Sequence, residues 1–371
     1  MSEQEDTMIQ QQFIEVLNQE LVAAREKGDL HNVVSTLNAI GLMHHNWGDV
    51  RRAMTYYKQA LALSREHGDR YHEQLSLDNL GDGYAILGAM QRSCTCYGQA
   101  LSIARECDDR QGESSALRGL GHASSRLGEL LQANDYYLQA LAIAREWSDR
   151  DGESRALYGL GDCYADRGHT RDAIDYLRQS LTIARERGNQ VSEYNARYGL
   201  GRAYYLQDEH GQAITYIEQA LKIAHTLGMR HAEGVARNEL GLVSQALGNV
   251  HTALDEYKKA LALVKTVGDQ HGEARVRGNI GTAYVALDDA RMARYYHEQA
   301  LKTARKVNDR QGEAHSSCWY LGMIAERYAG DLVKAAHLYE VCVTWQRDVG
   351  HPDAKKSARD LVRVKARLGQ K

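Results

Sequence analysis

The amino-acid sequence predicts an all-α fold, an α-solenoid of about eight helical hairpins with a half-repeat cap at each end. Three observations predict it. Pro352 is the one proline among 371 residues, and a proline inside a helix costs about 3 kcal/mol. A Leu-Gly or Ile-Gly pair returns every forty residues, and small residues return twelve and nineteen positions after each glycine. Two such columns in each forty residues indicate two helices per repeat.

The glycine of each pair falls within the first helix of its repeat. The column consists of Gly41, Gly81, Gly121, Gly161, Gly201, Gly241 and Gly281, and Gly322 follows one residue late. Glycine inside a helix costs roughly 1 kcal/mol relative to alanine, so its return requires a packing reason. We expect small residues of the second helix, such as Ala173 and Ser180, to pack against Gly161. Larger residues such as Tyr137 would then fill the space between hairpins.

The turns also repeat. Glycines predicted to end the first helix are Gly88, Gly128, Gly168 and Gly248. Joints predicted to end the second helix and to cap the next one with an aspartate are Gly68-Asp69, Ser148-Asp149 and Asn308-Asp309. A glutamate follows in the first turn of each first helix, at Glu73, Glu113, Glu153, Glu193, Glu233, Glu273 and Glu313. We interpret these glutamates as structural, because they face the positive end of the helix dipole.

The repeats divide the chain into three parts. Residues 1–29 form an N-terminal cap with a single helix over 7–27, residues 30–350 form eight repeats, and residues 351–371 form a basic C-terminal capping helix. Pro352 would occupy the first position of that last helix. The eighth repeat is irregular, since it carries an extra residue before Gly330.

These columns resemble the tetratricopeptide repeat. The matching features are Leu-Gly, a tyrosine three residues on (Tyr84, Tyr164, Tyr204 and Tyr284), a turn glycine and the two small residues. The period of forty and the Gly-Asp-Arg-x-x-Glu joint at 68–73 are most similar to the long-repeat branch that includes Pins-type adaptors and bacterial repeat proteins. The resemblance implies a right-handed superhelix whose concave wall consists of the first helices and grips a peptide or protein segment.

The first helices carry the candidate ligand-binding residues. Positions three before and one, four and five after the motif glycine lie away from the packed face. These positions and their neighbours give Asp78, Asp82, Arg118, His122, Arg126, Arg155, Tyr158, Asp162, Asp166, Asn195, Tyr198, Arg202 and Tyr205. Tyrosine and arginine are frequent binding hot spots. The set therefore predicts a protein or peptide ligand of mixed charge with an apolar anchor. The alternative is that these are solvated or stacking side chains.

Charge and composition restrict the other partners. The net charge of -3 disfavours general attraction to nucleic acid, and no apolar run is long enough to span a membrane. The C-terminal helix is locally basic, which suits a solvated cap, and the alternative is that nucleic acid or an acidic partner binds there. Six cysteines without a Cys-x-x-Cys pair and an acidic N-terminus unlike a signal peptide indicate a cytoplasmic protein. Oligomeric state is left open.

No motif for chemistry is present. The pattern Gly-Leu-Gly at 119–121, 159–161 and 199–201 lacks the third glycine and the preceding strand of a dinucleotide site. We therefore expect no catalytic residues, no cofactor and no metal site, and we expect the sixteen histidines to be solvated or partly packed. Two alternatives to a binding scaffold stay open. One is a peptide-responsive regulatory sensor, and the other is an unorthodox enzyme that uses groove residues such as His122 and Asp162.

Overall fold

The computed structural model describes residues 3–307, 313, 320–348 and 354–369. All regular structure in these residues is helical, which confirms the predicted all-α class. The chain divides into two compact units, unit 1 over Met1–Ala232 and unit 2 over Glu233–Lys371.

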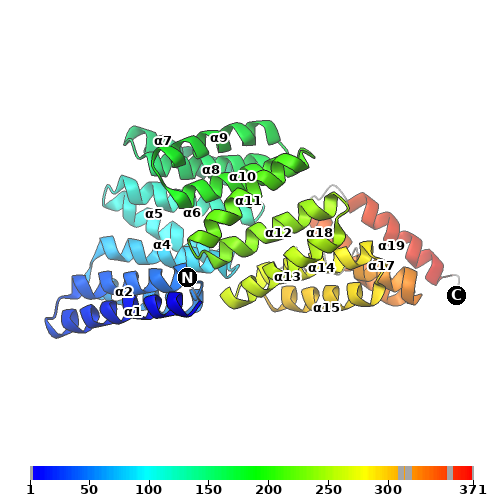
Figure 1. Cartoon of the computed structure of the whole chain (residues 1–371), viewed down its shortest axis with the longest axis horizontal. Helices are drawn as coiled ribbons and strands as arrows, with labels where there is room; N and C mark the ends of the chain where they lie inside the picture. The colour runs from blue at the N-terminus through cyan, green and yellow to red at the C-terminus, as the bar shows by residue number, and fades with distance from the viewer. Residues whose placement is uncertain (1–2, 308–312, 314–319, 349–353, 370–371) are drawn as a thin grey trace. The chain divides into compact units, whose positions relative to one another are not determined.

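Unit 1 consists of helices joined by short turns and stacked in chain order, from blue to green in Figure 1. They are α1 (Glu3–Glu26), α2 (Leu30–Asn46), α3 (Val50–His67), α4 (Arg70–Ile86), α5 (Met90–Glu106), α6 (Arg110–Arg126), α7 (Leu130–Glu146), α8 (Arg150–Asp166), α9 (Thr170–Glu186), α10 (Gln190–Tyr205), α11 (His210–Thr226) and the start of α12 (Arg230–Ala246). The even-numbered helices are the first helices of the repeats and are called A helices here. The odd-numbered helices from α3 are the second, or B, helices.

Unit 2 continues the pattern and ends in an irregular repeat. Its elements after α12 are α13 (Val250–Val267), α14 (Gln270–Ala286), α15 (Ala290–Lys306), α17 (Gly322–Ile324), the π-helix η2 (Ala325–Ala329), α18 (Leu332–Asp348) and α19 (Ala354–Leu368). The π-helix η2 accommodates the extra residue before Gly330, because a π-turn contains one more residue than an α-turn. Asn308, Asp309 and Pro352 lie outside the described residues.

The predicted turns are present. Gly88, Gly128, Gly168 and Gly248 have φ values of 75°, 85°, 80° and 81°, a left-handed conformation that glycine adopts without steric cost. At the next joint, the Asp149 carboxylate accepts a hydrogen bond of 2.9 Å from the backbone N–H of Gly152. This aspartate therefore caps α8.

The motif glycines face bulky side chains, which differs from the expectation. A methyl group added at Gly121 would lie 2.9 Å from the ring of Tyr137 on the B helix of the same repeat. Because glycine has no side chain, the ring can enter between the two helices. Gly161 meets the Leu177 side chain, and the backbone oxygen of Ala173 also lies against it, as expected for Ala173. Ser180 has a different role, because its hydroxyl donates to the backbone oxygen of Ser154 at 2.7 Å.

The recurring glutamate joins two helices. Glu113 on α6 is buried and accepts hydrogen bonds of 2.8 Å from Arg110 on its own helix and from Arg105 at the end of α5. Glu153 repeats the arrangement with Arg145 and Arg150. Burial raises the pKa of both carboxyls, but the hydrogen bonds from the two arginines outweigh it, so both pKa values are lowered. The expected structural role is thus carried by buried ion pairs at the joint between repeats.

The A helices form the inner wall of unit 1. Consecutive A helices contact each other along the whole series from α2 to α10, whereas consecutive B helices share no comparable contacts among the described residues. An array whose members approach more closely on one side curves toward that side. The A helices therefore line the concave side of this unit.

Candidate functional site

The predicted ligand-binding residues all lie on four A helices, α4, α6, α8 and α10, which we call the A-helix wall. Asp78 and Asp82 lie on α4, and Arg118, His122 and Arg126 lie on α6. Helix α8 carries Arg155, Tyr158, Asp162 and Asp166, and α10 carries Asn195, Tyr198, Arg202 and Tyr205. The repeat of forty places equivalent side chains at equal heights on successive helices. The wall thus presents rows of side chains that cross the repeats.

One row runs along the floor of the wall and is half-buried. It contains Asp78, Arg118, Tyr158 and Tyr198, each three residues before its motif glycine. The Tyr158 ring packs beside Gly199, where a methyl group would lie 3.3 Å from the ring. Tyr198 stacks on Tyr194 with ring centroids 6.1 Å apart. The aromatic half of this row is therefore held in place by packing.

The charged half of the row is desolvated and incompletely bonded. Burial raises the pKa of Asp78 well above its ordinary value, and nearby Asp82 raises it further. Burial lowers the pKa of Arg118 to about 10, with a contribution from Arg155. The Asp78 Oδ1 and Arg118 Nε atoms are buried and have no hydrogen-bond partner among the described residues. Because buried polar atoms are usually bonded, this pair offers one acceptor and one donor to a ligand.

The rim above Arg118 is exposed and basic. His122, Arg126 and Arg155 are all exposed side chains. The pKa of His122 is nevertheless lowered, first by the surrounding protein that displaces bulk water and then by Arg126. A side chain on a concave wall can reach solvent and still be flanked by protein on several sides. His122 is therefore more weakly protonated at neutral pH than a free histidine.

Arg202 brings two of the predicted acidic residues together. Its guanidinium pairs with Asp162 and Asp166 on the preceding A helix, α8. Burial raises the pKa of Asp166, and Arg202 opposes that rise. Three residues predicted to contact a ligand thus form a charge cluster within the wall. Asp82 has a protein partner too, since it accepts a hydrogen bond from Tyr97 on α5.

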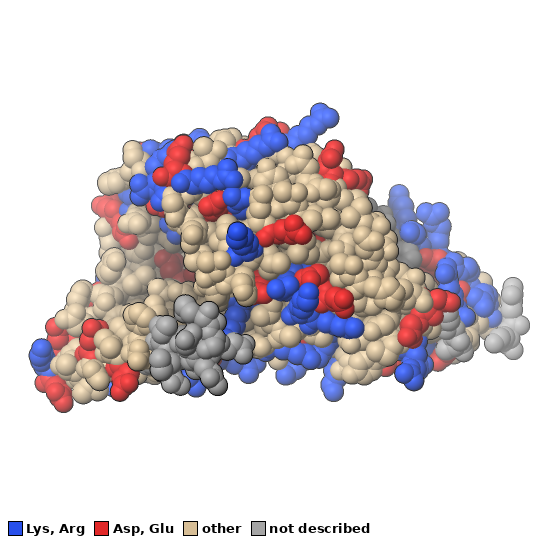
Figure 2. Space-filling view, viewed as in Figure 1, with Lys and Arg blue, Asp and Glu red and all other residues tan. Residues whose placement is uncertain are grey.

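The wall therefore separates into two regions. On the acidic and aromatic side, Arg202 offsets one of the two carboxylates of Asp162 and Asp166. On the other side, Arg118, Arg126 and Arg155 leave a basic surface beside Asp78. Elsewhere, charges of both signs are interspersed on the face shown in Figure 2.

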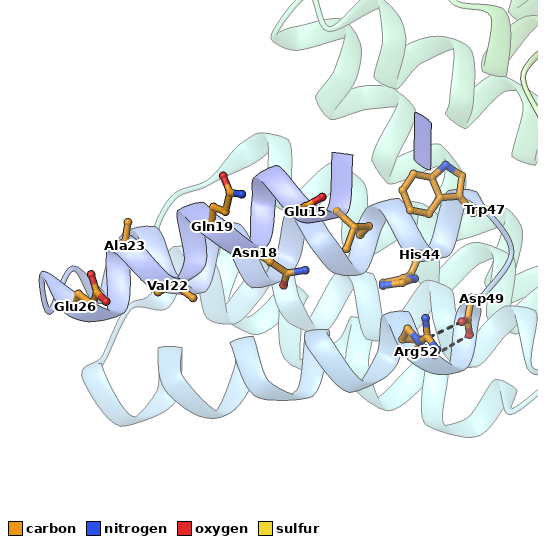
Figure 3. A pocket seen from close by; sticks show the side chains of 11 residues that line it. Glu15, Asn18, Gln19, Val22, Ala23, Glu26, His44, Trp47, Asp49 and Arg52 are labelled. Atoms are coloured by element: carbon orange, nitrogen blue, oxygen red, sulfur yellow. Dashed lines mark hydrogen bonds and ion pairs between the residues drawn. The ribbon is translucent and has the colours of Figure 1, made fainter. Parts of the chain in front are cut away.

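Unit 1 also contains a pocket beside the N-terminal helix. This pocket of about 880 Å³ is bounded by α1 on one side and by the α2–α3 turn on the other. Figure 3 shows Trp47 at one end and Glu26 at the other, with His44 and Arg52 facing α1. His44 stacks on Tyr56 with ring centroids 5.5 Å apart. The repeat columns do not predict this pocket, because α1 lacks them.

Several basic side chains of the C-terminal helix form ion pairs within unit 2. Arg363 and Arg367 on α19 both pair with Glu326, at 2.9 and 2.7 Å, and Lys365 pairs with Glu340 at 3.0 Å. Val364 on the same helix is fully buried. These contacts are those of a docked capping helix. Among the described residues, no helix combines the length and apolar character of a membrane span.

Family models agree with the repeat pattern. One model of the tetratricopeptide repeat matches residues 73–146, 114–186 and 232–306, which together exceed half of the chain. A second matches residues 34–67 and 194–225. The chain belongs to the tetratricopeptide repeat family. No curated protein matches it.

Several solved tetratricopeptide repeat structures share this fold. A Rap protein complexed with competence and sporulation factor is 14% identical, covers 91% of this chain and 98% of its own, and has a TM-score of 0.61. The Rap conjugation gene regulator of plasmid pLS20, in complex with the Phr* peptide, is 15% identical over 77% of each chain, with a TM-score of 0.63.

A signal transduction ATPase with a tetratricopeptide repeat sensor, from Pyrococcus horikoshii, is 16% identical. It covers 90% of this chain and 50% of its own, with a TM-score of 0.59. At these identities the likeness shows the fold.

Proposed function

We propose that this protein binds an extended peptide, or an extended segment of another protein, along the A-helix wall of unit 1. The observation that carries the proposal is the adjacent pair of buried, incompletely bonded polar atoms, Asp78 Oδ1 and Arg118 Nε. A peptide supplies both a donor and an acceptor for such a pair at each residue. Membership of the tetratricopeptide repeat family and the likeness to two Rap proteins whose structures are complexes with a peptide or a factor support the same function.

The distribution of charge suggests the chemistry of the ligand. An acidic ligand group would lie beside Arg118 and Arg155, where a charge-assisted hydrogen bond gains from low exposure to water. An apolar or aromatic anchor would pack on Tyr158 and Tyr198. Arg202 offsets one of the two carboxylates of Asp162 and Asp166, so this cluster attracts a basic ligand group less strongly than two unpaired aspartates would. Asp78 and Asp82 would accept from a ligand donor at the other end of the row.

Selection from a random peptide display library tests this proposal with a defined probe. Peptides selected on the full-length protein are expected to contain an acidic residue close to an aromatic or large aliphatic one. Their affinity should fall at least about tenfold in Arg118→Gln and Arg155→Gln, because interface hot-spot arginines contribute about 2 kcal/mol or more.

Arg171→Gln is the matched control, since Arg171 is exposed on the B helix α9. It should leave the affinity unchanged. Selected peptides that bind all three variants as tightly as the original protein would refute a site on the A-helix wall.

A second candidate is a sensor whose repeats shift when the peptide binds. The observation in favour is that the two Rap proteins share this fold at TM-scores of 0.61 and 0.63. Small-angle scattering of the full chain with and without a selected peptide separates the two. A changed radius of gyration supports the sensor, and an unchanged one supports a static scaffold. An enzyme in the wall has no comparable observation to support it.

A further inference from the structure

Two histidines and an aspartate converge at the joint between the first two repeats. His31 lies in the first turn of α2, Asp69 is the N-cap of α4, and His72 lies in the first turn of α4. The Nδ1 atoms of His72 and His31 lie 2.8 and 3.4 Å from the Oδ2 atom of Asp69. The potential ligand atoms of all three residues lie within 4.8 Å of one another.

The two oxygens of the Asp69 carboxylate have different partners. Asp69 Oδ1 caps α4 by accepting from the backbone N–H of His72 at 3.1 Å, while Oδ2 faces both imidazoles. The His31 and His72 rings meet edge to face, with centroids 4.5 Å apart. A helix cap accounts for Oδ1 and for one imidazole. It does not account for a second imidazole from a different helix on the same oxygen.

We propose that His31, Asp69 and His72 bind a divalent transition-metal ion of the Zn²⁺ type. Two imidazoles and one carboxylate are a ligand set that such ions prefer, and bonds of about 2.0–2.2 Å at tetrahedral angles place ligand atoms roughly 3.3 Å apart. The two distances to Asp69 Oδ2, 2.8 Å from His72 and 3.4 Å from His31, bracket that value. His72 is buried and its side chain is fixed, whereas His31 is exposed, so small rotations of His31 complete the site. The exposed side leaves the fourth position to water.

The other repeats show that this set is particular to one joint. Positions equivalent to His72 hold Gly112, Gly152, Ser192 and Gly272, none of which is a metal ligand of this type. At the joint between α8 and α10, Asn189 donates to Asp151 at 2.9 Å instead. An ordinary hydrogen bond therefore connects the repeats at that joint, without a set of metal ligands. The sequence does not predict the site, because Asp69 and His72 lie 38 and 41 residues from His31 and approach it only across the joint.

A bound ion would connect α2 to α4, two neighbouring A helices. It would fix the angle between the first two repeats beside the wall that carries Asp78. Since ligand binding to the folded state alone raises stability, the ion should also raise the melting temperature. This second consequence allows a test that does not depend on any peptide.

Titration of the full-length protein with Co²⁺, read by visible absorbance, tests the proposal, and Zn²⁺ competition confirms the site. We expect one tight equivalent of Co²⁺, displaced by Zn²⁺, and a higher melting temperature with Zn²⁺. Affinity should fall more than about tenfold in His31→Ala, since even residues that only support a metal ligand contribute 10–100-fold.

His31 is exposed, so its substitution should not prevent folding. His67→Ala is the matched control, because His67 is an exposed histidine near the joint whose ring nitrogen contacts the Leu63 carbonyl instead. It should bind Co²⁺ like the original protein. Equal affinity in His31→Ala, or an absence of any tight equivalent in the original protein, would overturn the proposal.

Discussion

Arg202 on α10 pairs with Asp162 on α8, and the two residues hold the same position in consecutive repeats, one after the motif glycine. Asp166, one turn further along α8, pairs with the same guanidinium. An ion pair between equivalent positions connects neighbouring repeats without changing the scaffold columns. It also removes charge that would otherwise face a ligand.

Replacing Arg202 with glutamine should make stability depend on pH in a specific direction. The folded pKa of Asp166 is already raised by burial, and loss of Arg202 should raise it further. A carboxyl with a raised folded pKa stabilises the fold below its unfolded pKa, and this contribution is lost as pH rises through the folded pKa. Arg202→Gln should therefore be less stable by about 1–3 kcal/mol at pH 7.5 and recover part of that loss near pH 5.5. Thermal melting at both pH values measures this.

Arg171→Gln serves as the control for that experiment, because this exposed arginine lies on a B helix. Its melting temperature should match the original protein at both pH values. A deficit in Arg202→Gln that is equal at pH 7.5 and 5.5 would contradict the assignment of Asp166 as the responding group.

The buried glutamates predict acid sensitivity. The folded pKa values of Glu113 and Glu153 are lowered by their arginine partners. Their contribution is present above the unfolded glutamate pKa of about 4.3 and is lost as pH falls through the lower folded values. Glu153→Gln should lower the free energy of unfolding by about 1–3 kcal/mol at pH 7, and lose less stability than the original protein on acidification. Denaturant unfolding at a series of pH values measures both effects.

Glu66→Gln is the comparison, because Glu66 is exposed. Its unfolding should follow the original protein at every pH. Identical acid sensitivity in Glu153→Gln and the original protein would show that this ion pair does not contribute.

Two glycines should respond to alanine in opposite directions. A methyl group at Gly159 would collide with the buried ring of Tyr137, whereas nothing lies within 4 Å of one at Gly98, inside α5. Gly98→Ala should stabilise by about 0.5–1 kcal/mol through helix propensity. Gly159→Ala should destabilise by about 1–3 kcal/mol, since overpacking exceeds that gain. Denaturant unfolding of both variants gives the two values, and a stabilised Gly159→Ala would contradict the packing account.

The fold could be predicted from the sequence because each repeat has the same pattern of residues at the same positions of its two helices. The motif glycines, the turn glycines such as Gly88 and the capping aspartates such as Asp149 each recur at a fixed spacing, so chance patterns average out. The partner of the motif glycine was predicted less well. Spacing shows that a close approach occurs, but not that Tyr137 rather than a small residue makes it.

The candidate site could be predicted only in outline. Helical spacing places Arg118 and Tyr158 on the wall. It does not show that Arg202 reaches back to Asp162, because a long side chain can pair in several directions. The joint of His31, Asp69 and His72 was also beyond prediction, since it depends on the distance between separate helices.

The location of the ligand is the central claim, and site-specific photo-cross-linking tests it most directly. A p-benzoylphenylalanine residue replaces His122 on the A-helix wall or Leu131, which is 71% exposed on the B helix α7. A library-selected peptide should cross-link to the protein substituted at 122, with loss of the cross-link when excess unlabelled peptide is added, and should not cross-link at 131. Competable cross-linking at 131 with none at 122 would contradict binding along the A-helix wall.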